Sequence, residues 1–270
     1  RCRDRLANLL CVPLSRLPCA FRRKVLENFE YAFPAQSVKE REALYRAFIR
    51  VGLKVIFGYG EPFFRSQDFL KKTFLVTGGE HLKSALASGK PLIFLGSHSW
   101  AVDHCGLYLS ASGLPMCTFM HTSGNRVYDW FMNSMRLKFG GKVYERSSGI
   151  RALVRCLRDG YHLAFYPDQD LGEHSALFVP FFATPKATLV VLPRLAALGR
   201  ALVVPMFAAY NEEHHLYEVI FDAPFDNYPS ADLKADVRRM NKAIEDALKG
   251  REMQYMWFLR FYQTRPAESE

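Results

Sequence analysis

The feature that most constrains this chain is the alternation of short apolar segments with amphipathic ones between residues 74 and 167. Apolar runs such as "PLIFLGS" (91–97) and "YHLAFYP" (161–167) have the length of buried strands, whereas 80–88 and 149–160 have the spacing of helices. Short apolar strands need helices on both faces to bury them. The sequence therefore predicts an α/β fold with a mixed, mostly parallel sheet covered by helices on both faces.

The same pattern predicts the remaining elements. Ser37 and Glu40 have the spacing of a capping box and predict the start of a helix over 37–57. No repeat and no Pro-, Gly- or Ser-rich linker divides the chain. The other expected strands are 74–78, 115–120, a segment around 142–145, 201–210 and 215–224, and the other expected helices are 100–110, 127–139, 188–199 and 230–250.

The N-terminal stretch mixes apolar and basic residues. Over residues 5–24, leucines alternate with arginines, which is typical of a segment at an anionic membrane surface and equally of a helix packed on the protein's own core. No apolar run approaches the roughly 20 residues of a membrane-spanning helix. Because the first residue is Arg1 rather than Met, we expect a piece of a longer protein, which leaves room for an anchor or signal segment before it.

The net charge and the cysteine content indicate which classes of partner and which redox compartment to expect. The formal net charge of +9 favours anionic partners such as phospholipid head groups, phosphorylated substrates, an acidic protein or nucleic acid. The six cysteines lack C-x-x-C spacing and are too sparse for a disulfide scaffold. We expect free thiols in a reducing compartment.

Three ionisable residues follow the apolar strand at 91–95, where ligands bind in α/β sheets. If His98 lies just before a helix and Asp103 in its first turns, the carboxylate can accept the Nδ1 proton and leave Nε2 free to act as a base. The chain has no G-x-S-x-G elbow, so we expect the nucleophile to come from the substrate. His104 is expected to be a packed helix residue.

Two later blocks carry polar residues at strand ends. In 122–141, Arg126 and Arg136 would bind phosphate or stabilise an oxyanion, or else lie solvated at the surface. In "FYPDQD" (165–170), the acidic side chains would be helix caps, metal ligands or acceptors for a polar substrate.

A third block, 178–196, has an aromatic loop before an expected helix start. The loop at 179–182 would line an acyl-chain groove or lie buried in the core. Lys186 and Thr188 follow it directly.

Taken in order, these blocks resemble a known family. "HSWAVD" with its H-x-x-x-x-D spacing, "GNRVYD…R", "YPDQD" and "FVPFFATPKAT" are similar to the late acyltransferases of lipid A biosynthesis, the lauroyl/myristoyltransferase family within the glycerolipid acyltransferase-like superfamily. "ENFEYAFPAQSVKERE" and "QYMWFLRFYQTRP" extend the resemblance to about residues 25–266. "GGKVYER" and "FFATPKAT" resemble the myristoyl-adding branch, whereas Phe261, Tyr262 and Gln263 replace basic residues usual in the family.

The resemblance implies one acyltransferase domain over 1–270, with a helical membrane-proximal part over 1–60 and a catalytic core over 70–266. It implies transfer of a C12–C14 chain from acyl carrier protein to a 3-hydroxyacyl hydroxyl of a Kdo-bearing lipid A precursor, at the cytoplasmic face of the inner membrane. His98 would be the base, Asp103 its orienting partner, and Arg136 the oxyanion or phosphate ligand. The residues expected to bind substrate are Asn125, Arg126, Asp168, Gln169, Asp170, Lys186 and Thr188.

The resemblance implies no metal, no cofactor, no covalent enzyme intermediate and no nucleic-acid partner. Two rival hypotheses stay open on the residues alone. The first is acyl transfer to a glycerolipid or another glycolipid, and the second is a non-catalytic basic module that binds membranes or nucleic acid. The acyl-chain length, the acylated position and the oligomeric state are three-dimensional facts that the sequence leaves open.

Overall fold

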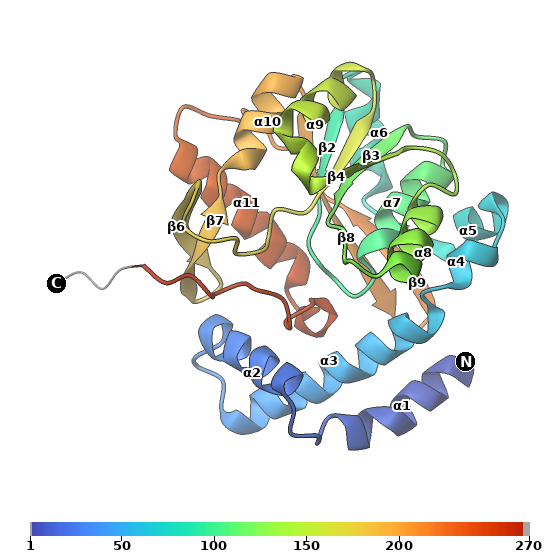
Figure 1. The fold of residues 1–270 in the computed structure, drawn as a ribbon, viewed down its shortest axis with the longest axis vertical. Helices are drawn as coiled ribbons and strands as arrows, with labels where there is room; N and C mark the ends of the chain where they lie inside the picture. The colour runs from blue at the N-terminus through green and yellow to red at the C-terminus, as the bar shows by residue number, and fades with distance from the viewer. Residues whose placement is uncertain (1, 267–270) are drawn as a thin grey trace.

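The computed structural model of the chain describes residues 2–266. A seven-stranded sheet with the order β1-β9-β8-β2-β5-β3-β4 runs through its centre (Figure 1). Its strands are β1 (Phe74–Thr77), β2 (Leu92–Leu95), β3 (Met116–Met120), β4 (Lys142–Glu145), β5 (His162–Phe165), β8 (Leu202–Asn211) and β9 (Leu216–Phe221).

Five neighbouring strands, from β8 to β4, run parallel to one another. β9 is antiparallel to β8, and β1 pairs parallel with β9 at the edge. All four residues of β2 are buried, because helices cover both faces of the sheet. The prediction of a mixed, mostly parallel sheet flanked by helices is confirmed.

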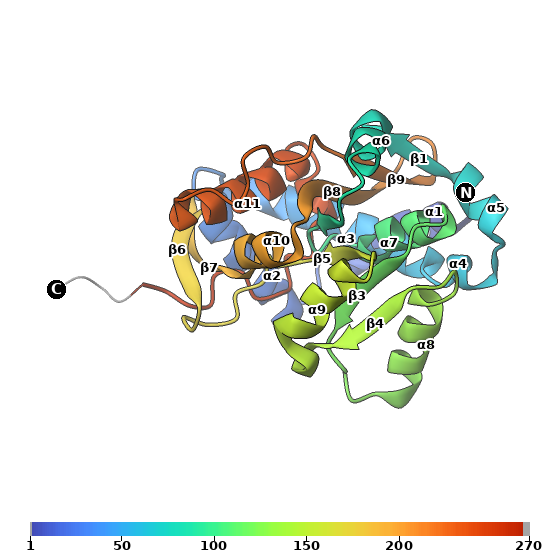
Figure 2. The same cartoon turned by 90° about the horizontal axis from the view of Figure 1, so that it is seen from above.

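The helices form a layer on each side of the sheet (Figure 2). α7 and α8 lie on one face, and α9 and α10 on the other, where α10 packs on both α9 and α11. The bounds are α6 (Gly79–Ala87), α7 (Val102–Ala111), α8 (Arg126–Arg136), α9 (Gly149–Arg158), α10 (Val191–Gly199) and α11 (Leu233–Leu248). Short helices are α4 (Glu61–Phe64), α5 (Gln67–Thr73) and the 3₁₀ turns η1 (Arg146–Ser148) and η2 (Glu252–Gln254).

The first three helices, α1 (Cys2–Leu14), α2 (Ala20–Ala32) and α3 (Val38–Gly58), lie together across one end of the sheet (Figure 1). α3 begins with the predicted capping box, in which Ser37 and Glu40 bond reciprocally. α1 packs on α3, burying Ala7 and Cys11 and leaving Leu9 exposed. The described residues include no helix that is both long and apolar enough to span a bilayer.

The segment expected to be an apolar loop is a β-hairpin of β6 (Ala176–Phe181) and β7 (Thr184–Leu189). Along β6, Val179 and Phe181 are buried and Pro180 between them is exposed, the period-two pattern of a strand with one face on the core. The loop prediction was therefore wrong, and α10 begins at Val191 rather than at residue 188.

Two adjacent strand ends and the C-terminal segment meet at one place. The Gly96 N–H donates to the Phe165 carbonyl, which holds the turns after β2 and β5 side by side. A Cβ on Gly96 would lie 2.2 Å from Cε1 of Tyr166, so only glycine allows this approach. Ser99 pairs with Tyr255 in an isolated antiparallel bridge, which brings the C-terminal segment to the same point.

Candidate active site

His98 lies at the carboxyl end of β2, as predicted, and its imidazole pairs with Asp168 from the end of β5. Nδ1 of His98 is 2.5 Å from Oδ1 of Asp168, and the backbone N–H of His98 donates to Oδ2 at 2.7 Å. These two hydrogen bonds to Asp168 fix both the backbone at His98 and the orientation of its imidazole ring. The pair has the geometry of a base and its orienting acid.

Asp168 is fully buried, yet it keeps a negative charge. Burial would raise its pKa, but the adjacent His98 and its hydrogen bonds, helped by the positive charge of Lys186, hold the pKa below its usual value. The Tyr255 hydroxyl donates to Oδ2 at 2.9 Å. Nζ of Lys186 donates to the Asp168 backbone carbonyl at 2.8 Å and lies 3.9 Å from the Phe181 ring centroid.

Gln169 lies on the other side of the imidazole. Its side-chain Nε2 is 3.1 Å from Nε2 of His98. With Asp168 accepting the Nδ1 proton, Nε2 is left unprotonated and accepts the Gln169 amide hydrogen. Nε2 is therefore the atom available to take a proton from a substrate that displaces the amide.

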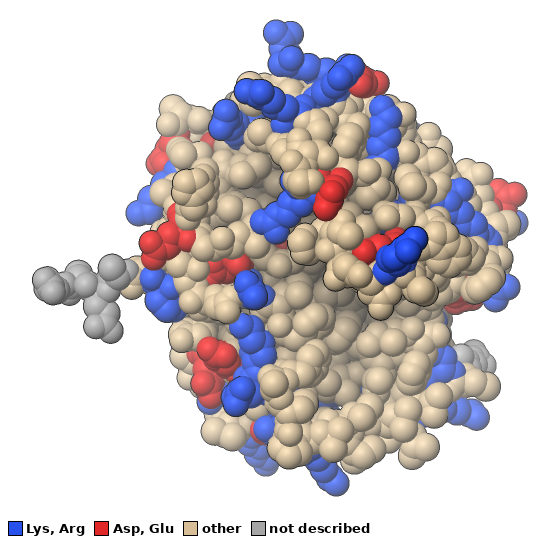
Figure 3. Space-filling model, viewed as in Figure 1, with Lys and Arg blue, Asp and Glu red and all other residues tan. Residues whose placement is uncertain are grey.

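His98 and Gln169 line a cleft of about 500 Å³, within the range of small-molecule sites. The same face of the molecule is hollowed near its centre (Figure 3). Most of the wall is apolar. The apolar lining comes from four parts of the sheet region: Phe119 and Met120 of β3, Ile150 and Leu153 of α9, Phe165 of β5, and Leu189 and Val191 around the start of α10.

Asp103 does not take the role predicted for it. Its Oδ1 accepts a hydrogen bond from Nε of Arg136 at 2.6 Å, and its Oδ2 accepts one from the Tyr59 hydroxyl. The expected pairing of His98 with Asp103 was wrong, because helix α7 starts only at Val102 and turns this carboxylate toward α3 and α8. Asp168, predicted to bind substrate, occupies the position next to His98.

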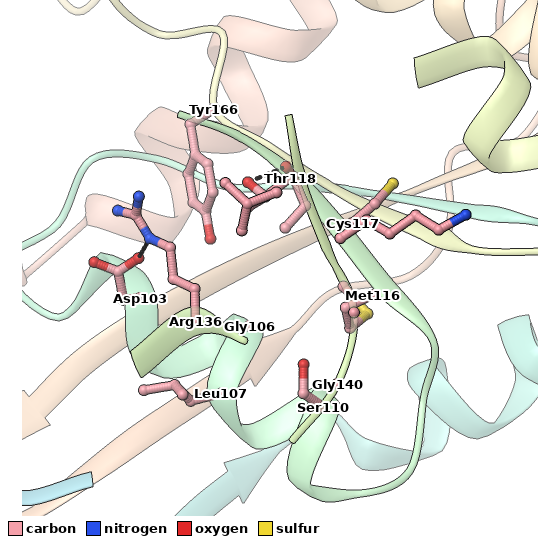
Figure 4. A pocket seen from close by; sticks show the side chains of 14 residues that line it. Asp103, Gly106, Leu107, Ser110, Met116, Cys117, Thr118, Arg136, Gly140 and Tyr166 are labelled. Carbon is pink, nitrogen blue, oxygen red and sulfur yellow. Dashed lines mark hydrogen bonds and ion pairs between the residues drawn. The ribbon is translucent and has the colours of Figure 1, made fainter. Parts of the chain in front are cut away.

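Arg136 and Asp103 line a separate cavity of about 40 Å³ beside the cleft (Figure 4). Tyr166 borders both spaces. Burial would raise the Asp103 pKa, but the Arg136 charge and the hydrogen bonds from Arg136 and Tyr59 together outweigh burial and lower the pKa. The Arg136 charge is thus neutralised within the protein.

The remaining predicted substrate ligands, apart from Arg126, have partners inside the chain. Asn125 caps α8 by accepting from the N–H groups of Val127 and Tyr128, and Arg126 is exposed on the first turn of the same helix. Asp170 is buried and accepts hydrogen bonds from Thr264 at 2.6 and 2.7 Å. Burial removes Lys186 and Thr188 from the cleft wall, and burial lowers the Lys186 pKa to about 8.

Sequence reasoning missed the part that the C-terminal segment plays. Besides the Tyr255 bond to Asp168, the Met256 N–H donates to the His98 carbonyl, and the Trp100 N–H donates to the Gln254 carbonyl, both at 2.8 Å. The motif "QYMWF" entered only as part of the family resemblance, and nothing in its residues indicated contact with His98 or Asp168.

Two further expectations concern histidine and metal. His104 is buried and stacks on Tyr217 with ring centroids 3.6 Å apart, and burial lowers its pKa to about 4, so the prediction of a packed residue is confirmed. Within residues 2–266, no three His, Cys, Asp or Glu side chains are grouped as metal ligands would be.

Comparison with known proteins places the chain in a family. The model of the family described as bacterial lipid A biosynthesis acyltransferase matches residues 2–264. The chain belongs to this family. A lipid A biosynthesis acyltransferase of Haemophilus influenzae is 34% identical over 269 residues, which cover 98% of this chain and 83% of that protein.

Relatives in this acyltransferase family differ in the acyl group that their names specify. The lipid A biosynthesis myristoyltransferase of Escherichia coli K12 is 34% identical over 250 residues, covering 93% of this chain and 77% of that protein. The lauroyltransferase of the same organism is 26% identical over 259 residues, covering 94% and 84%. Family membership makes this chain an acyltransferase-family protein of lipid A biosynthesis.

We predict that Asp168→Asn lowers the rate of acyl transfer by about 10²–10⁴-fold, because the neutral amide no longer stabilises a protonated His98. The measurement is kcat with a thioester donor and a lipid acceptor, on protein shown to be folded by circular dichroism. Asp236→Asn, also buried but accepting a hydrogen bond from the Ser230 N–H away from the cleft, is the matched control and is expected to keep most of the activity. Near-normal kcat for Asp168→Asn would contradict the pairing.

We predict that Arg136→Met destabilises the fold by about 3–5 kcal/mol near neutral pH, because the Asp103 carboxylate loses its ion-pair partner and keeps only the hydrogen bond from Tyr59. Without Arg136, burial raises the Asp103 pKa above its unfolded value, so the loss shrinks as pH falls and the carboxylate protonates. Urea unfolding at about pH 7.5 and about pH 5 measures the difference. Unchanged stability with lost activity would instead place Arg136 in the reaction.

Proposed function

We propose that this chain moves a C12–C14 acyl group, most simply myristoyl, from acyl carrier protein to a 3-hydroxyacyl hydroxyl of a Kdo-bearing lipid A precursor. The observation that carries the proposal is the pairing of His98 with Asp168 at the wall of an apolar cleft. Family membership and the 34% identity to a myristoyltransferase support it. We also propose that the fold is of the glycerolipid acyltransferase-like type.

In the proposed mechanism, His98 Nε2 removes the proton from the acceptor hydroxyl as its oxygen attacks the thioester carbonyl. Asp168 stabilises the imidazolium that forms, through Nδ1. The C–O bond forms, the tetrahedral intermediate collapses, and the C–S bond breaks. The imidazolium returns the proton to the departing thiolate, so no acyl-enzyme, metal or cofactor takes part.

The surroundings of His98 suit both the alkyl chain and the anionic head group of such an acceptor. The apolar wall formed by Phe119, Ile150 and Leu153 suits an alkyl chain. A more open depression of about 480 Å³ adjoins the cleft, and Arg146 borders both spaces. Arg260 also lines that depression and is exposed like Arg146. Two guanidinium groups suit the phosphates or sugar carboxylates of an anionic head group.

The net charge of +9 suits the other proposed partners as well, since acyl carrier protein and the inner leaflet are both anionic. We propose that the protein acts at the cytoplasmic face of the inner membrane. No nucleic-acid partner is proposed.

His98→Ala is expected to lower transfer by at least about 10²–10⁴-fold while leaving the fold intact, because a positioned general base contributes that much. Purified protein, myristoyl-acyl carrier protein and the lipid A precursor provide the assay, with mass spectrometry of the product giving the chain and its position. His104→Gln, a change in a histidine away from the cleft, is the comparison. Near-normal turnover by folded His98→Ala would refute the mechanism.

The double variant Arg146→Ala, Arg260→Ala is expected to raise KM for the lipid A precursor about tenfold with kcat little changed, because it removes two ligands of the head group. The effect should weaken at high salt, since exposed charges are screened. Arg194→Ala, an exposed arginine on α10, is the matched control. An unchanged KM would exclude this depression as the head-group site.

A further inference from the structure

Helices α4 and α8 expose large apolar side chains on a common surface. Phe64 is 81% exposed, Val127 74%, Trp130 62% and Tyr128 53%. These residues are contiguous: the ring of Phe63 lies 5.1 Å from that of Phe64 and 6.1 Å from that of Trp130, and Val127 is one turn from Trp130. Contiguous apolar patches, unlike single exposed residues, mark interaction sites. We call Phe64, Val127, Tyr128 and Trp130 the α4–α8 face.

The α4–α8 face is not needed to hold α8 in place. The opposite side of α8 buries Met132 and Met135 against Leu107 of α7. Asn125 caps the N-terminus of α8, and Arg136 in its last turn bonds to Asp103. The helix is therefore fixed at both ends and along its inner side, while its outer side contributes little to that packing.

Exposed basic residues lie on the same elements as the α4–α8 face or follow them in the chain. Arg126 stands at the start of α8, and Arg65, Lys71 and Lys72 follow α4 in the chain, all of them exposed. The acidic residues on these elements are Glu61, Asp68 and Asp129. Asp129 is engaged by the Ser123 N–H, and Glu61 lies within ion-pair distance of Arg65 and Arg3. Figure 3 shows a broad surface with few charged side chains over α3, whereas both basic and acidic side chains are visible at the position of α8.

The face is linked to the cleft through β3 and the connection that follows it. Met120, the last residue of β3, and His121 both line the cleft, and Met120 also packs against Met132 and Met135 on the inner side of α8.

We propose that the α4–α8 face docks on an anionic lipid bilayer, with Trp130 at the level of the head groups. Tryptophan and tyrosine favour this interface, because their rings are apolar and their N–H or O–H groups stay hydrated. Exposed arginine and lysine beside them add attraction to anionic lipids. The proposal rests on the proposed function only for its purpose, namely delivery of a lipid acceptor to the cleft, because docking itself requires no turnover.

Trp130 provides a direct readout, because the other two tryptophans, Trp100 and Trp257, are 7% and 0% exposed. The full chain is titrated with vesicles of phosphatidylglycerol and phosphatidylcholine. We expect a blue shift of the emission and quenching by brominated lipids, weaker on pure phosphatidylcholine and at high salt. Trp130→Phe should lose the signal but still sediment with the vesicles.

Trp130→Ser and Phe64→Ser should each weaken vesicle partitioning about tenfold, since each withdraws a large apolar group from the bilayer. Leu198→Ser on α10, an exposed apolar residue on the other side of the sheet, is the matched control and should bind normally. Leu9→Ser, on the exposed side of α1, tests the competing membrane surface.

Vesicle binding without a change in Trp130 emission, or binding lost only in Leu9→Ser, would overturn the proposal. Dimerisation in the absence of vesicles that Trp130→Ser abolishes would also overturn it, by assigning the face to a second copy. Trp130→Ser should transfer acyl groups normally to an acceptor dissolved in detergent micelles. Failure of wild-type transfer in that assay would refute the proposed function and leave the vesicle result standing.

Discussion

The carboxylate of Asp168 holds together three segments that are far apart in sequence. It accepts hydrogen bonds from the backbone and ring of His98, after β2, and from the Tyr255 hydroxyl in the C-terminal segment, while itself following β5. A charge buried this completely is stable only when its oxygens are satisfied. The same bonds that make burial tolerable also orient the imidazole, so stability and catalytic geometry depend on one group.

The surrounding structure keeps that group in place by close packing. Gly96 lets Tyr166 approach the turn after β2, and Gly52 of α3 lies where a Cβ would be 2.6 Å from the Trp100 ring. Helix α3 thereby packs against Trp100, which lies in the loop that carries His98. Asp103, Arg136 and Tyr59 form a second buried polar group, which ties α7 to α3 and α8. The protein thus has two separate polar pairs. The Asp103–Arg136 ion pair connects helices, and the His98–Asp168 pair lies at the cleft.

The sequence predicted the sheet, its helical cover and the place of His98, because strand and helix periods are local properties. The sequence did not predict which carboxylate pairs with His98. Spacing along the chain favoured Asp103, whereas the partner comes from the adjacent strand, and strand order is set by long-range packing. The β6–β7 hairpin was missed because its aromatic residues and prolines outweighed a short alternating pattern. Tyr255 carried no local sign of its contact with Asp168.

The central claim is that Asp168 acts on the reaction through His98. A double-mutant cycle on acyl transfer, with His98→Ala, Asp168→Asn and the double variant, tests it most directly. The account predicts that the double variant transfers at about the rate of His98→Ala alone, because Asp168 has no function once the imidazole is absent. If the two losses multiply instead, Asp168 acts independently of His98, and the proposed mechanism is contradicted.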